Sequence, residues 1–171
     1  MEHPVKTPPD ARFDGSARVV ETPTFPAPWS GLPAVVVVWR FSSSRGHLLA
    51  SGALGEVLVL DTAIGLVEVP LAGTEFVLAP PTDNGEPVTR PIPSVFEPVL
   101  PRLTGHAGYE LHAREDRLVG GDSVHLVAEA LLSARGDAYR TAARPGPEVA
   151  WRVDAARGRC RVIGSWLPVR G

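Results

Sequence analysis

Residues 34–41 read AVVVVWRF, which is the most strand-like stretch in this chain of 171 residues. Four consecutive valines followed by a tryptophan favour a β-strand, because branched and aromatic side chains fit the pleated surface of a sheet. The near-continuous apolar character predicts a strand that is buried on both faces or lies centrally. This stretch therefore predicts the central strand of a β protein.

The composition extends this prediction to the rest of the chain. It contains 18 prolines and 17 glycines, and prolines at this frequency interrupt any long helix. Short apolar segments separated by turn residues recur about every 8–12 residues, which is the pattern of a sandwich or small barrel. We expect an all-β, mostly antiparallel fold, either a partly open small barrel or a sandwich, with one short helix.

Two hairpins are expected from local patterns. In residues 56–71, EVLVLD and LVEVPL flank the turn residues TAIG. In residues 148–164, apolar and polar residues alternate on both sides of ARG, which predicts a C-terminal hairpin. The loop at 80–87 contains Asn84-Gly85, and its glycine supplies the positive φ that a tight turn requires.

The short helix is expected at residues 94–103, where Ser94 is a candidate N-cap and prolines limit the length. Residues 124–132 follow a Gly-Gly-Asp turn and favour a strand, although their AEALL segment is also a good helix former. For domain organisation, we expect residues 1–15 to form a disordered Pro-rich arm and residues 16–171 to form a single β domain.

Several functional classes are disfavoured by composition. The formal net charge is −2 and no block of like charges occurs, whereas dedicated nucleic-acid binders present a basic face. A single cysteine, Cys160, allows neither an intramolecular disulfide nor a cysteine-built zinc site. No stretch approaches the roughly 20 apolar residues of a membrane-spanning helix, and residues 1–15 lack the apolar core of a signal peptide. We expect a cytoplasmic protein without a cofactor.

Asp122, Ser123 and His125 are the residue types of a hydrolytic triad. On a strand, Ser123 and His125 share a face at a Cα separation of roughly 7 Å, and GGDSVH lacks the spacing of a nucleophile elbow. We therefore expect no catalytic site here and expect Asp122 to cap its own turn. A small hydrolase using His125 and Asp122 remains the alternative reading.

A metal site and a reactive thiol are also disfavoured. His106 and His112 are six residues apart, which on a strand separates them by roughly 20 Å, too far to share a metal. Cys160 lies between two arginines that strand alternation places on the opposite face, so we expect a buried, inert thiol. We expect no metal.

Three blocks of the sequence resemble one family, in the same order. They are ARVVETPTFPAPWSGLPAVVVVWRF at 17–41, VLVLDTAIGLVEVPLAG at 57–73 and YELHAREDRLVGGDSVHLVAEA at 109–130. These blocks are similar to the opening, the central hairpin and the final turn-and-strand of the GIDE-type domain, also called the "beside a membrane" domain. The resemblance covers residues 16–132 and implies a β domain in which the final element is structural.

The chain also departs from that family. Eukaryotic members carry two membrane spans and a cysteine-rich RING, and this chain has neither, so the resemblance implies no ligase activity. A family glycine after the last strand is Ala128 here. Residues 133–171 fall outside the resemblance and form a C-terminal extension that contains the second hairpin.

Exposed loops carry the candidate partner contacts. Trp29 and Trp166 each lie beside proline in a loop, where tryptophan is a frequent interface anchor; the alternative is that each packs back onto the fold and covers an end. Leu32 in the same loop as Trp29 and Asn84 in the exposed loop at 80–87 complete the set of candidate contacts. We therefore expect a non-enzymatic interaction or scaffold module that binds a protein partner in a bacterial, membrane-associated complex. A self-assembling structural subunit is a further alternative.

Overall fold

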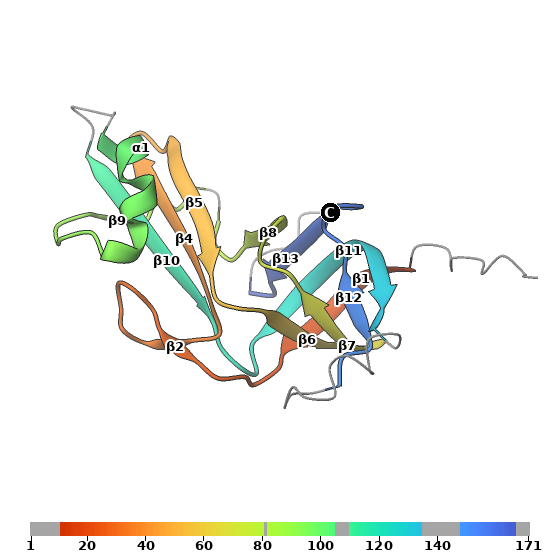
Figure 1. Ribbon diagram of the computed structural model, residues 1–171. Helices are drawn as coiled ribbons and strands as arrows, with labels where there is room; N and C mark the ends of the chain where they lie inside the picture. The colour runs from red at the N-terminus through yellow and green to blue at the C-terminus, as the bar shows by residue number, and fades with distance from the viewer. Residues whose placement is uncertain (1–10, 81, 105–109, 135–147, 167–171) are drawn as a thin grey trace, which may run out of the picture.

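The structure is a computed structural model that describes residues 11–80, 82–104, 110–134 and 148–166. The described chain forms a closed five-stranded barrel with a separate four-stranded sheet beside it (Figure 1). The expectation of a mostly β fold with one short helix is confirmed. The barrel is closed rather than partly open, because its first strand pairs with both of its neighbours in the ring.

The barrel mixes antiparallel and parallel pairs. Its strands, in ring order, are β1 (Ala11–Val19), β6 (Leu58–Thr62), β7 (Gly65–Val69), β12 (Trp151–Val153) and β11 (Ser123–Ser133). β12 runs parallel to β7, and the other neighbours in the ring are antiparallel. Two further strands, β13 (Cys160–Gly164) and β8 (Thr74–Val77), extend the sheet outward from β11.

Strand alternation fills the barrel interior. Leu60, Val67, Leu126 and Val162 are fully buried and pack in one apolar cluster. Their neighbours along each strand point outward, so each strand contributes every second side chain to the core. Ala128, which stands where the resembled family has glycine, is also buried in this cluster.

The second sheet lies to one side of the barrel. Its strand order is β5 (Leu48–Leu54), β4 (Val36–Ser43), β10 (Leu111–Leu118) and β9 (Glu86–Pro87), and a two-residue ribbon, β2 (Phe25–Pro26) with β3 (Pro33–Ala34), precedes β4. β4 is central and buried on both faces, as its sequence predicts. Val36 and Val38 join the barrel core, whereas Trp39 and Phe41 belong to a separate aromatic core on the opposite face.

The helical segment covers that aromatic core. A 3-10 helix, η1 (Ser94–Val99), continues into α1 (Leu100–Thr104), in agreement with the expected helix at 94–103. Pro93 rather than Ser94 occupies the N-cap position, and no side chain caps it. Phe96 enters the core from η1 and is 2% exposed.

The N-terminal boundary expected from the sequence is wrong. β1 begins at Ala11, so residues 11–15 belong to the barrel rather than to a disordered arm. Phe13 packs against the barrel core and explains why this segment is ordered. Residues 1–10 lie outside the described residues.

The expected C-terminal hairpin is also wrong. β12 and β13 do not pair with each other; β12 pairs with Leu131–Ser133 and β13 pairs with Val124–Ala128. The two strands thus follow one another along the edge of β11 opposite β1. By contrast, the hairpin expected at 56–71 is confirmed as β6 and β7.

Candidate functional site

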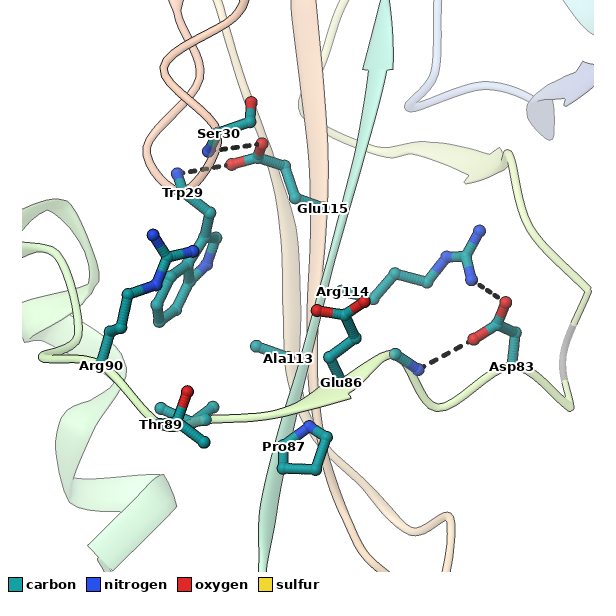
Figure 2. Close-up of a pocket in the computed structure, with 12 residues that line it drawn as sticks. Trp29, Ser30, Asp83, Glu86, Pro87, Thr89, Arg90, Ala113, Arg114 and Glu115 are labelled. Carbon is teal, nitrogen blue, oxygen red and sulfur yellow. Dashed lines mark hydrogen bonds and ion pairs between the residues drawn. The ribbon is translucent and has the colours of Figure 1, made fainter.

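A cleft with a volume of about 490 Å³ opens beside β10 in the four-stranded sheet. One wall is the loop that carries Trp29 and Ser30, and the other is the segment from residue 83 to residue 90 (Figure 2). Ala113, Arg114 and Glu115 of β10 lie between these walls. We call this the Trp29 cleft. It brings together two loops that the sequence singles out separately.

Trp29 packs back onto the aromatic core and also lines the cleft. Its indole stacks on Phe96, with ring centroids 6.1 Å apart and an interplanar angle of 23°, and meets Phe41 edge-on at 6.3 Å. Its Nε1 is buried and has no hydrogen-bond partner within the described part of the chain. The side chain is therefore a half-buried wall rather than a freely projecting anchor.

Glu115 fixes the loop that carries Trp29. The backbone N–H of Trp29 donates to Oε2 of Glu115 at 2.7 Å, and the N–H of Ser30 donates to Oε1 at 3.2 Å (Figure 2). Hydrogen bonds to an ionised acceptor are stronger than those between neutral groups. One carboxylate thus ties residues far apart in sequence and sets the position of the cleft wall.

The opposite wall is held by charge pairs. Arg114 binds Asp116 through Nε and Nη2, at 2.9 Å and 3.0 Å, and also pairs with Asp83. Asp83 accepts the N–H of Gly85 at 2.9 Å. The Arg114 hydrogen bond, followed by that from Gly85, lowers the pKa of Asp83 below its ordinary value. The hydrogen bond to Asp116, followed by that to Asp83, raises the pKa of Arg114.

Gly85 allows this wall to approach β10. Its φ is +77°, which confirms the positive φ expected for the Asn84-Gly85 turn, and a Cβ at Gly85 would lie 2.2 Å from the carbonyl oxygen of Ala113. Asn84 itself is anchored to β4, because its carbonyl accepts the Ser42 hydroxyl at 3.3 Å. Asn84 is half-buried and does not line the cleft.

The edge of β10 is open beyond the cleft. The N–H of Val88 donates to the carbonyl of Leu111, so Leu111 directs its backbone toward β9. The direction of the N–H and carbonyl groups alternates along an antiparallel strand. The backbone groups of Ala113, Glu115 and Arg117 therefore point toward the same edge as those of Leu111. β9 pairs only as far as Ala113, and no described strand covers the remainder of this edge.

Leu32 and Trp166 are exposed but lie outside the cleft. Leu32 is 49% exposed and donates its N–H to the Ser30 hydroxyl at 3.2 Å. Trp166 is 54% exposed and donates its Nε1 hydrogen to the carbonyl of Leu78, next to β8. Neither residue lines the Trp29 cleft, so the structure does not unite the four candidate contacts in one site.

The candidate triad residues are engaged elsewhere. Asp122 caps its own turn as expected, because its Oδ2 accepts the N–H of Val119 at 2.9 Å. His125 places Nε2 2.5 Å from Oδ1 of Asp14 on the neighbouring strand β1. The structure therefore pairs His125 with Asp14 instead of with Asp122.

No group of three or more metal-binding side chains occurs in the described segments, and His106 lies outside them. Cys160 is a buried free thiol, and burial raises its pKa, as expected for an inert cysteine. None of the helices in the described part of the chain is long and apolar enough to cross a membrane.

Sequence reasoning missed the charged residues that build the cleft. Residues 114–117 read REDR and look like a self-neutralising surface run. Strand alternation could have indicated their roles, because it places Arg114 and Asp116 on one face of the sheet and Glu115 on the other. Only the fold shows that Glu115 meets the loop at Trp29.

Comparison with known proteins found no matching family model, curated protein or solved structure.

Proposed function

We propose that this protein is a non-enzymatic interaction module that binds an extended peptide segment of a protein partner in the Trp29 cleft. The observation that carries this proposal is the open edge of β10 at Glu115 and Arg117, directly beside a cleft. An extended peptide can add to such an edge through main-chain hydrogen bonds, while pockets beside the edge select its side chains. The peptide would continue the line that β9 begins.

The cleft supplies both apolar and charged contacts for such a peptide. The Trp29 indole offers a flat apolar wall, and tryptophan is enriched among residues that dominate binding energy. Glu86 and Arg90 are exposed on the opposite wall and carry opposite charges. The buried Nε1 of Trp29 has no acceptor within the described part of the chain, and a peptide carbonyl is an acceptor of the kind that it lacks.

The cellular setting of this proposal rests on the sequence. The order of the three blocks that resemble the GIDE-type domain supports a module of a bacterial, membrane-associated complex. The composition supports a cytoplasmic location and a partner other than nucleic acid.

A matched pair of variants tests strand addition. Peptides would be selected from a displayed random library on the immobilised protein, and their affinities measured by calorimetry. Arg117→Pro removes the outward N–H without touching the β4 ladder, because proline is tolerated where the N–H faces away from the sheet. Arg117→Ala removes the same side chain, including its hydrogen bond to the Pro33 carbonyl, but keeps the N–H.

We expect Arg117→Pro to bind the selected peptides at least about tenfold more weakly than Arg117→Ala. Amide hydrogen exchange at Glu115 and Arg117 should slow when peptide binds. Arg90→Glu should also weaken binding, whereas Arg159→Glu, an exposed charge reversal outside the cleft, should not. Equal affinities of the two Arg117 variants, with both folded by circular dichroism, would show that the β10 edge is not used.

A further inference from the structure

The opposite edge of the four-stranded sheet is a second interaction surface. We propose that β5 pairs antiparallel with β5 of a second copy of this chain, about a two-fold axis at Ser51. The two sheets would then form one continuous sheet across the dimer. This surface lies at the other end of the strand order from the β10 edge, so it is independent of peptide binding.

The backbone of β5 is available for such pairing. The N–H of Ser44 donates to the carbonyl of Glu110, just before β10. Backbone direction alternates along β4, so the N–H and carbonyl of Trp39 point toward β5, where its partner is Gly52. Ser51 and Ala53 flank Gly52 and therefore point their N–H and carbonyl groups away from β4. No strand in the described segments pairs with this edge.

β5 also lacks the features by which proteins protect a free edge. It is seven residues long, reads LLASGAL, and contains no charged residue and no proline. Charged residues and proline are the usual protection, and an unprotected apolar edge pairs readily with another strand. By contrast, the outermost strands β8 and β9 carry such residues: β8 contains Glu75 and β9 is Glu86-Pro87.

The sequence of β5 suits pairing with itself. A two-fold axis at Ser51 places Ala50 opposite Gly52 of the second copy, and small residues there allow the backbones to approach closely. A β-bulge between Ala50 and Leu48 ends the regular register of β5, so the paired segment is centred on Ala50–Gly52. Leu48 lies just beyond it and is 54% exposed. Self-complementary surfaces of this kind are what a two-fold dimer requires.

A cleft of about 880 Å³ leaves room beside β5. Its floor is the sheet face that carries Arg40 and Asp116 as well as Ser51 and Ala53, and the segment 71–79 forms its far side. A strand added to the β5 edge would lie beside this cleft, where Leu71 and Phe76 are apolar, and apolar burial is the main favourable contribution to association.

Cysteine trapping tests the position of the axis. In an antiparallel hydrogen-bonded pair, directly opposite Cα atoms are about 5.5 Å apart, within the range that a disulfide spans. We expect Ser51→Cys to form a cross-linked dimer on mild oxidation. Ser44→Cys, in an exposed turn nearby, should cross-link at least about tenfold more slowly. The native thiol does not interfere, because Cys160 is buried.

Charge substitution tests the same axis without cross-linking. Within one chain, Ser51→Glu places an acid beside its cross-strand neighbour Arg40, which stabilises the folded monomer. In the dimer, the same substitution places two acids opposite each other at the two-fold axis, where they repel. By light scattering at micromolar concentration, we expect wild type and Ser44→Glu to be dimers and Ser51→Glu to dissociate. A monomeric wild type, or equal cross-linking of the two cysteine variants, would overturn the proposal. Arg117→Pro should leave the dimer intact, which separates this result from the outcome for peptide binding.

Discussion

At the scale of single residues, the Trp29 cleft depends on two positions, Gly85 and Glu115, whose contacts no other side chain would reproduce. Gly85 brings the outer wall against the backbone of β10, and Glu115 draws in the loop on the other side. Both contacts join segments far apart in the sequence. The cleft is therefore a product of tertiary structure, although each residue acts through a simple local requirement.

The first prediction concerns Gly85. Gly85→Ala adds a Cβ that meets the Ala113 carbonyl and also strains a residue at φ +77°. We expect it to lower the free energy of unfolding by about 1–3 kcal/mol and to weaken peptide binding. The control is Gly121→Ala, which has φ +91° but no atom within 4 Å of the added Cβ. Equal losses for both variants in urea titrations would show that the close contact is unimportant.

The second prediction concerns the pH dependence of the Asp83–Arg114 pair. Arg114 lowers the pKa of Asp83 in the folded state, so the ionised carboxylate stabilises the fold above the ordinary pKa of aspartate. This contribution is lost as the pH falls through the lowered pKa. We expect the melting temperature of wild type to exceed that of Asp83→Asn near neutral pH, and the difference to shrink in acid. A difference that is constant with pH contradicts the assignment.

At the scale of elements, the aromatic core explains why a short helix is enough to cover one face of the sheet. Phe96 lies among Trp29, Trp39 and Phe41, with centroid distances of 5.2 Å to both Trp39 and Phe41. Edge-on and offset aromatic contacts of this kind add to the stabilisation from apolar burial. Phe96 is the one residue of η1 that is buried, and Val99 and Leu103 add partly or fully buried contacts to the same core.

The third prediction follows from this arrangement. Phe96→Ala should lower the free energy of unfolding by about 3–5 kcal/mol, because it leaves a cavity among rigid rings. The near-ultraviolet circular dichroism of the tryptophans should weaken as Trp29 loses its stacking partner. Val95→Ala, at a neighbouring position that is 47% exposed, should change stability by less than about 0.5 kcal/mol. A small effect of Phe96→Ala would mean that η1 is held by other contacts.

Elements with strong local signals are the ones that sequence reasoning predicts correctly. β4 has its valine run and β6–β7 has turn residues between two apolar segments, so both are visible locally. The sequence does not predict β5, because LLASGAL has neither alternation nor β-branched or aromatic residues; it is a strand because β4 pairs with it. The C-terminal hairpin was predicted wrongly, because local alternation does not say which strand is the partner.

At the scale of the whole molecule, barrel closure joins the two ends of the described chain. β1 pairs with β11 over most of its length, and β12 closes the remaining gap between β7 and β11. Pairings this distant in sequence lie beyond the reach of local patterns, which is why the sequence suggested a partly open barrel. The same reason applies to the cleft: its loops were predicted individually, but not their meeting across β10.

The fourth prediction tests this closure. Ala17 pairs with strands on both sides, opposite Val124 and Thr62, so Ala17→Pro interrupts β1 where the barrel has no free edge. We expect a loss of about 3 kcal/mol or more, measured by chemical denaturation. Ala11→Pro, at the first residue of β1, should be tolerated better. Equal effects of the two substitutions would argue that β1 is not integral to the barrel.

The position of β12 has a consequence for synthesis of the protein in the cell. A ribosome makes β1, β6, β7 and β11 well before residues 151–153, yet β12 lies between β7 and β11. The nascent chain therefore carries an incomplete barrel with two unpaired strand edges until residues 151–153 have left the exit tunnel. Chaperones that shield unpaired strands during elongation should raise the yield of native protein.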